Sequence, residues 1–169
     1  MPIMTHYRRI VVGTDGSPLA GPTIARAAVL AADSDAELVL VCAYSALSQR
    51  DEARTSATTA EPLRGPVLGR QAATLALESG AALAQGLGAR VAPPLLVEAE
   101  PATALVRTAE VQDANLIVIG AVRDRSIANR LLGDVATDVV RNARCDVLIV
   151  RPPEELGEPQ EFEVPADDV

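Results

Sequence analysis

The sequence predicts an α/β protein with an open, doubly wound, five-stranded parallel sheet that is covered by helices on both faces. Three observations favour this fold class. Short runs of Val, Ile and Leu lack the polar alternation of half-exposed strands, which indicates buried parallel strands. Each run is separated from the next by a stretch with apolar residues at helical spacing, as in right-handed crossover units. Aromatic residues make up only 2% of the chain, so small aliphatic side chains must build the core.

Five apolar runs are the expected strands. Two prolines, Pro93 and Pro94, precede the third run and restrict it to an edge or to the beginning of a strand. The last run is short and apolar, and Pro152 and Pro153 stop it. We expect it at one edge of the sheet, where free backbone groups invite pairing with another chain. The five runs are residues 9–14, 37–43, 95–98, 116–119 and 146–150.

Four segments between these runs have the period of amphipathic helices. The first begins near residues 18–22, the second ends near residues 86–88, Pro101 opens the third, and residues 134–143 form the fourth. Residues 44–69 lack such a period and are predicted to be a long loop. The residues expected to face inward are Ile24, Ala27, Ala28 and Ala31, then Ala72, Leu75, Ala76, Ser79 and Leu83, then Ala102, Leu105 and Ala109, and finally Ala136, Val139, Val140 and Ala143.

Charge divides the chain into a domain over residues 1–151 and an acidic tail over residues 152–169. All 15 basic residues are arginines, and Arg151 is the last of them. The tail holds seven of the 23 acidic residues, and the 16 that remain nearly balance the arginines. Its polar composition without a period predicts disorder. The nearly neutral domain gives no electrostatic support for nucleic-acid binding.

Several sequence patterns are absent, and their absence limits the cellular location and the catalytic chemistry that we expect for this protein. No apolar run approaches the length of a membrane span, and no signal-peptide pattern begins the chain, so a cytoplasmic location is expected. Cys42 and Cys145 fit small buried hydrophobes in a reducing compartment better than a disulfide. Because His6 is the only histidine, no zinc-type cluster is visible, and a Ser-His-Asp mechanism would depend on that residue. No catalytic residue is predicted.

Three strand ends carry residues that could contact a ligand. Open α/β sheets bind ligands at the carboxyl ends of strands, beside the point where the strand order reverses. The segments at these ends are GTDGS after the first run, CAYS after the second and GAVRDRS after the fourth. The chain has no lysine and no G-x-x-x-x-G-K-[ST] pattern, which excludes a P-loop. A G-x-G-x-x-G fingerprint is also absent after the first run.

Two stretches, VVGTDGS at residues 11–17 and VIGAVRDRSIANRLLGDVATDVVRNARCDVLIVRPP at residues 118–153, resemble the universal stress protein family. The resemblance covers roughly residues 8–151. It implies a Rossmann-like fold of the adenine nucleotide alpha hydrolase type and a sensor or regulatory role. It also implies a homodimer formed through the strand at residues 146–150, where Asp146 and Arg151 could pair across the two-fold axis.

Nucleotide-binding members of that family carry a G-2x-G-9x-G(S/T) motif around the phosphates. Gly120 matches the first glycine and Gly133 the last, whereas Arg123 replaces the second glycine and Asp134 replaces the Ser or Thr. Arg123 blocks close approach of the backbone, although its guanidinium could bind phosphate from another direction. Asp134 brings negative charge to a helix start, where it also fits an N-cap or a first-turn acid. The triphosphate site is therefore predicted to be impaired.

The rest of the implied pocket is better preserved. The resemblance assigns Asp15 to the ribose or to a metal, such as Mg²⁺ with ATP, although in T-D-G-S it fits a turn-capping aspartate equally well. It also implies that main chain after the second strand reads adenine and that amides after Gly133 face an anion. The predicted binding residues are Thr14, Asp15, Cys42, Ala43, Gly120, Arg123, Gly133, Asp134, Val135 and Ala136.

Three functions stay open from the sequence. The first is a module that binds ATP weakly or prefers AMP or cyclic AMP. The second is a stress protein that binds no nucleotide and works through protein–protein contacts of the 45–69 loop and the acidic tail. The third is slow ATP hydrolysis through Asp15, which would have to orient metal or water without help from another predicted group.

Overall fold

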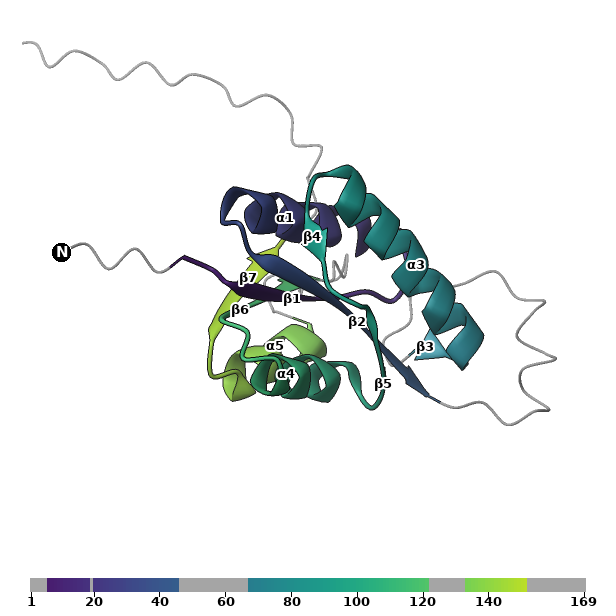
Figure 1. Cartoon of the computed structure of the whole chain (residues 1–169). Helices are drawn as coiled ribbons and strands as arrows, with labels where there is room; N and C mark the ends of the chain where they lie inside the picture. The colour runs from purple at the N-terminus through teal and green to yellow at the C-terminus, as the bar shows by residue number, and fades with distance from the viewer. Residues whose placement is uncertain (1–5, 19, 46–66, 122–132, 152–169) are drawn as a thin grey trace, which may run out of the picture.

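The predicted α/β class is confirmed by a computed structural model that describes residues 6–18, 20–45, 67–121 and 133–151. Strands β2, β1, β6 and β7 lie side by side in that order, and β5 pairs with the other edge of β2 (Figure 1). Every pairing is parallel. The bounds are β1 Arg9–Gly13, β2 Glu37–Ser45, β5 Leu95–Glu98, β6 Leu116–Gly120 and β7 Asp146–Val150.

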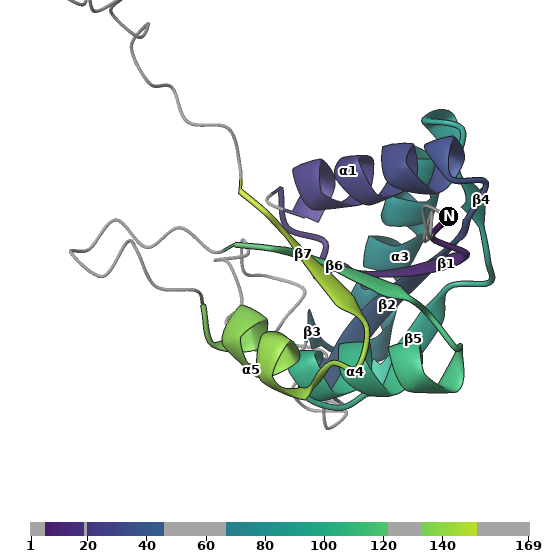
Figure 2. The ribbon, with the colours of Figure 1, turned by 90° about the vertical axis from the view of Figure 1, so that its left-hand side faces the viewer.

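Helices cover both faces of this sheet, as Figure 2 shows. On one side lie α1 (Ala20–Asp33) and α3 (Arg70–Gly86), and on the other lie α4 (Pro101–Val111) and α5 (Asp134–Asn142). Successive residues of a strand point to opposite faces, and both faces are buried here. Ile10 and Val12 of β1 enter the core under α1 and α3, whereas Val11 enters the core under α4 and α5. This two-sided burial is the reason that the strands read as continuous apolar runs.

The inward face predicted for α1 is confirmed, because Ile24, Ala27, Ala28 and Ala31 are all buried. The face predicted for the second helix, α3, is wrong. Of its five predicted residues only Ala76 is buried, and Leu75 is 58% exposed. The buried face of α3 instead consists of small residues and Leu77. In α5 the prediction holds for Ala136 and Val139, but Val140 is exposed.

Close packing explains the error in α3. A Cβ atom on Gly80 would lie 2.8 Å from Cδ2 of Leu40 and 3.1 Å from Cδ1 of Ile24. The helix therefore approaches β2 and α1 with its smallest side chains, and its larger leucines, Leu75 and Leu83, remain outside. An alanine-rich sequence carries apolar residues on several sides, so its period does not indicate a single face.

Two short strands complete the sheet. β3 (Val67–Leu68) pairs with Tyr44 and Ser45, and β4 (Arg90–Val91) pairs with the beginning of β2. The predicted loop is therefore too wide at both ends, because β2 extends to Ser45 and β3 begins at Val67. Residues 46–66 of that loop lie outside the described residues, as does the predicted tail. Within the described ranges, no helix is long and apolar enough to cross a membrane.

Candidate functional site

Five of the ten predicted site residues lie at or next to the carboxyl ends of β1, β2 and β6, namely Thr14, Asp15, Cys42, Ala43 and Gly120. These three strands are neighbours, and Val12 of β1 pairs with Leu40 on one side and with Val118 on the other. Along the chain, β2 and then β5 are added on one side of β1, and β6 is added on the other side of β1. The strand order thus reverses beside β1, which is the place where open α/β sheets bind ligands.

The turn after β1 is held by its own side chains. Gly16 donates its N–H to Oγ1 of Thr14 at 3.2 Å, and Ser17 donates its N–H to Oδ1 of Asp15 at 2.9 Å. Gly16 has a φ of 75°, and a Cβ atom there would lie 2.9 Å from Cβ of Ala76 in α3. Asp15 is therefore a turn-capping residue in this structure. Its second carboxylate oxygen is not used in that bond and can accept another donor.

Asp15 also lies within electrostatic reach of Cys42 on the neighbouring strand. Burial raises the pKa of the Cys42 thiol to about 12, and the nearby Asp15 carboxylate adds to the increase. The thiol is fully buried and remains protonated at neutral pH, so that it packs as a small hydrophobe rather than acting as a nucleophile. Asp15 and Cys42 are therefore neighbours across β1 and β2.

The main chain of β2 has an open edge beside this place. β1 pairs with β2 as far as Val41, and Thr14 donates its N–H to the Val41 carbonyl at 2.9 Å. Tyr44 pairs with β5 on one edge of β2 and with β3 on the other. β3 therefore lies on the same edge as β1, and its pairing begins at Tyr44. Within the described ranges, no strand pairs with Cys42 or Ala43 on this edge.

Ala43 is the residue whose main-chain groups face this open edge. The N–H and C=O groups of successive residues alternate between the two edges of a strand. Carbonyls of Val41 and Ser45 both accept bonds on the β1 side, from Thr14 and Gly69. The N–H and C=O of Ala43, midway between them, point to the same side. A contact from the Cys42 thiol, at 3.8 Å, reaches the Ala43 carbonyl.

The end of β6 and the beginning of α5 hold the motif residues. Gly120 ends β6, and Gly133 is the N-cap of α5, with its carbonyl accepting the N–H of Thr137 at 2.9 Å. Asp134 is an exposed acid in the first helical turn, and glycine rather than Asp134 occupies the N-cap. Arg123 lies outside the described residues.

The first turn of α5 offers main-chain donors. Val135 is half-buried and Ala136 is buried, so their side chains anchor the helix start against the core under α4. Amides in a first helical turn lack partners within the helix, and the dipole makes that end positive. An anion could bind there, but it would meet the carboxylate of Asp134 at the same terminus.

Among the described residues, no group of three or more His, Cys, Asp or Glu could hold a metal ion. His6 precedes β1 and therefore lies at the opposite end of the sheet from Asp15, and its carbonyl accepts a bond from Asn115. This separation excludes a Ser-His-Asp arrangement that contains both His6 and Asp15.

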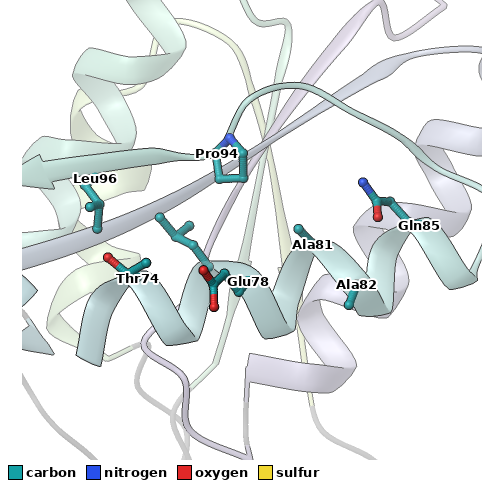
Figure 3. A pocket seen from close by; sticks show the side chains of 8 residues that line it. Thr74, Glu78, Ala81, Ala82, Gln85, Pro94 and Leu96 are labelled. Atoms are coloured by element: carbon teal, nitrogen blue, oxygen red, sulfur yellow. The ribbon is translucent and has the colours of Figure 1, made fainter. Parts of the chain in front are cut away.

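A groove of about 440 Å³ lies elsewhere, between α3 and the segment that leads into β5 (Figure 3). Its lining is mostly apolar and includes the polar side chains of Thr74, Glu78 and Gln85. None of the predicted binding residues lines it, so the groove is separate from the strand ends. The lining residues are Thr74, Leu77, Glu78, Ala81, Ala82, Gln85, Pro94 and Leu96.

Two contributors to the site region are missing from the sequence-based prediction. β3 limits the open edge of β2, but a strand of two residues is too short to give a periodic signal. Thr23 of α1 lies against Gly120. Its spacing of four residues from the inward Ala27 was a usable signal for a buried position.

Comparison with known proteins gives consistent matches over the domain. A sequence profile of the Universal stress protein family matches residues 6–151. Universal stress protein Rv1636 of Mycobacterium tuberculosis is 37% identical over 147 residues, which cover 87% of this chain and 98% of the relative.

Solved structures agree with this assignment. A universal stress protein in complex with cAMP is 32% identical, with a TM-score of 0.65, and the match covers 87% of this chain and 98% of that one. The universal stress protein from Archaeoglobus fulgidus is 26% identical, with a TM-score of 0.63, and the match covers 85% and 98% of the two chains. This chain belongs to the universal stress protein family.

Proposed function

We propose that this protein is a regulatory or sensor module that binds an adenine nucleotide with few phosphates, such as AMP or cyclic AMP. The open main-chain edge at Ala43 carries this proposal. Adenine presents an N–H donor beside a nitrogen acceptor. The C=O and N–H of Ala43 offer the complementary acceptor and donor on a single residue. Reading by main chain accounts for a binding position that has no polar side chain.

The position of Asp15 supports the same ligand. Its Oδ1 accepts the Ser17 amide, and its other oxygen is available to a ribose hydroxyl near the Ala43 edge. A universal stress protein 32% identical to this chain has been solved in complex with cAMP. A ligand with base and ribose in this place would have its phosphate directed toward β6 and α5.

Charge at the beginning of α5 supports a preference for few phosphates. The first-turn amides attract one anionic group, whereas the exposed carboxylate of Asp134 repels each further phosphate. Arg123 would supply a compensating guanidinium. ATP would therefore bind more weakly than AMP and would require Mg²⁺, and hydrolysis is not part of this proposal.

Isothermal titration calorimetry with cyclic AMP, AMP and ATP, with and without Mg²⁺, tests the proposal. We expect cyclic AMP or AMP to bind at least tenfold more tightly than ATP, a difference of about 1.4 kcal/mol. Titrations without heat at millimolar ligand, supported by an absence of thermal stabilisation, would contradict nucleotide binding. Tighter binding of ATP would contradict the role given to Asp134.

A pair of substitutions tests the motif itself. Arg123→Gly with Asp134→Ser restores the family pattern and should strengthen ATP binding relative to AMP. Asp134→Ser alone is the matched control, because it removes the repulsive charge and keeps the guanidinium. An unchanged preference in both variants would show that these two positions do not control the number of phosphates.

We further propose a cytoplasmic homodimer formed through β7. This strand ends the described strand order, and its four apolar side chains are only half-buried, two on each face of the sheet. Antiparallel pairing with a second copy would satisfy its free edge. Asp146 accepts a bond from the Tyr7 hydroxyl at 3.2 Å, so the suggested pairing with Arg151 across the axis would compete with it. The substitution Leu148→Arg tests this interface and should give monomers in sedimentation velocity.

A further inference from the structure

The outer edge of β5 is not paired with another strand in the described part of the chain. On its inner edge β5 pairs with β2, and Leu96 is in register with Cys42. The Leu38 carbonyl accepts the N–H of Ala92 at 2.9 Å, so Leu38 and, four positions on, Cys42 direct their main chain to this side of β2. In a parallel ladder Cys42 then bonds to the residues before and after Leu96. The N–H and C=O of Leu96 itself therefore point away from β2.

The groove between α3 and the segment that leads into β5 lies directly beside this edge. Figure 3 shows Leu96 and Pro94 on one side of the groove and α3 on the other. The Leu96 side chain lines the groove and packs against the core under α1 and α3. In an antiparallel pair, directly opposed residues place their side chains on the same face of the sheet. A residue paired with the main chain of Leu96 would therefore direct its side chain into the groove.

Two exposed carboxylates flank this position. Glu78 lines the groove from α3, and Glu98 follows Leu96 by two residues, on the same face of the strand. Within the described ranges the arginine ion pairs use other carboxylates, those of Asp35, Glu37, Glu110 and Asp113. A segment that pairs with this edge would thus gain from positive charge on both sides of its apolar residue.

We propose that the outer edge of β5 and this groove form a docking site for an extended segment of a partner protein, with one aliphatic residue between two basic residues at alternating positions. The main chain of the segment adds as a strand beside Leu96, its aliphatic side chain fills the groove, and its basic side chains meet Glu78 and Glu98. Pro93 and Pro94 have no N–H to donate, which limits the pairing to a short segment.

The position and the charge of this edge distinguish it from other features of the chain. It lies on the opposite side of β2 from the open edge at Ala43, so docking does not depend on the proposed nucleotide binding. The chain's own tail over residues 152–169 is acidic, and the carboxylates of Glu78 and Glu98 would repel it.

NMR titration of the isotope-labelled full chain with the capped peptide Arg-Thr-Leu-Thr-Arg tests the site. Threonine favours an extended conformation, and the alternation puts the leucine and both arginines on one face. We expect the Leu96 amide to shift with a Kd below about 1 mM, and the peptide Glu-Thr-Leu-Thr-Glu to bind about tenfold more weakly. An absence of binding at millimolar peptide, or shifts that leave Leu96 and α3 unchanged, would overturn the proposal.

A change in the peptide alone tests strand addition without altering the protein. N-methylation of the central leucine removes the amide that donates to the Leu96 carbonyl and should weaken binding about tenfold. Equal binding of the methylated and unmethylated peptides would mean that the main chain of β5 takes no part, and would overturn the proposal.

Substitutions on the protein test the charge and the groove. Glu78→Arg should weaken the arginine peptide about tenfold and strengthen the glutamate peptide. Glu110→Arg is the matched control, because it makes the same change of charge on α4, which covers the other face of the sheet. Ala81→Phe fills the groove and should weaken both peptides in a protein that unfolds at the same Tm. Equal effects of Glu78→Arg and Glu110→Arg would indicate attraction by net charge alone and would overturn the proposal.

Two other occupants of the groove give different results with the same variants. A lower sedimentation coefficient of peptide-free Ala81→Phe would show that a second copy of this chain covers the edge. A rise in peptide affinity of about tenfold after deletion of residues 152–169 would show that the chain's own tail occupies the groove. Either result would overturn the assignment to a partner protein.

Discussion

The two ends of the sheet are held by different means. At the amino end, polar side chains bind the main chain of neighbouring segments. Oδ1 of Asn115 accepts the N–H groups of Arg8 and Arg9 at 3.0 and 3.3 Å, and its Nδ2 donates to the carbonyl of His6 at 3.1 Å. This single amide joins the beginning of β6 to the beginning of β1.

A charged pair reinforces the same end. Nη2 of Arg9 lies 2.6 Å from Oε2 of Glu37 on β2, and Nη1 of Arg9 donates to the carbonyl of Gln112 at 2.7 Å. At the carboxyl end, the side chains of Thr14 and Asp15 accept hydrogen bonds from their own turn. The comparison teaches that, among the described residues, the side chains that join neighbouring strands lie away from the predicted ligand, and that the carboxyl end keeps main-chain groups of β2 available.

The largest effect is expected from Gly16→Val, which breaks the turn at the carboxyl end. Positive φ disfavours a β-branched residue, and the new Cβ would press on Ala76. Together these effects should cost about 2–5 kcal/mol of unfolding free energy. Urea denaturation measures the loss. Gly21→Ala is the control, since its Cβ meets nothing within 4 Å and the change should be neutral or stabilising.

The next effect concerns the amino end. Asn115→Ala removes three hydrogen bonds to main chain and should cost about 1–3 kcal/mol in the same assay. Affinity for cyclic AMP should change less than twofold, because the ligand is expected at the other end. Asn115→Asp keeps the acceptor and should recover part of the stability. A large loss of affinity in a folded Asn115→Ala protein would contradict the separation of the two ends.

A smaller effect is expected from the Arg9–Glu37 pair. Both side chains are about one third exposed, at 36% and 31%, so that solvent screens their attraction. A double-mutant cycle with Arg9→Gln and Glu37→Gln should give a coupling of about 0.5–1 kcal/mol, and 1 M salt should reduce it. A coupling several times larger would show that the pair is effectively buried.

The smallest effect on stability near neutral pH is expected from Cys42→Ala. Since the folded pKa of this thiol is raised from 9.0 to about 12, its contribution to stability is present below pH 9 and is lost as the pH rises from 9 to 12. Cys42→Ala should flatten that alkaline decline. Asp15→Asn should lower the thiol pKa, which thiol reactivity against pH measures. An unchanged reactivity profile would contradict the closeness of Asp15 and Cys42.

The helices α1 and α3 and the edge of β2 show which parts of the fold could be predicted from the sequence. The inward face of α1 was predictable because Ile24, Ala27, Ala28 and Ala31 follow helical spacing. The face of α3 was not, because alanines on every side hide the face that packs, and Gly80 carries no hydrophobic signal. The strand ends were predictable from the apolar runs. The open edge of β2 was not predictable, because it depends on where β3 pairs with β2.

The predicted site shows a similar limit. Asp15 was assigned equally to ribose binding and to turn capping, and the structure shows the turn cap without excluding a second partner. Gly120 fits a phosphate motif by spacing alone, yet spacing contains no information about Thr23, which lies 97 positions earlier in the chain. A glycine required for packing and a glycine required for a ligand look the same in a sequence.

The open edge at Ala43 also has a consequence for how such a site can appear or vanish during evolution. Its length is set by the register of β3 against β2, which begins at Tyr44. A shift of β3 by two residues toward Val41 would pair the main chain of Cys42 and Ala43 and would close the edge. An insertion or deletion between Ser45 and Val67 could produce this shift while every residue of the site stayed the same. Relatives with identical site residues could then differ in ligand binding.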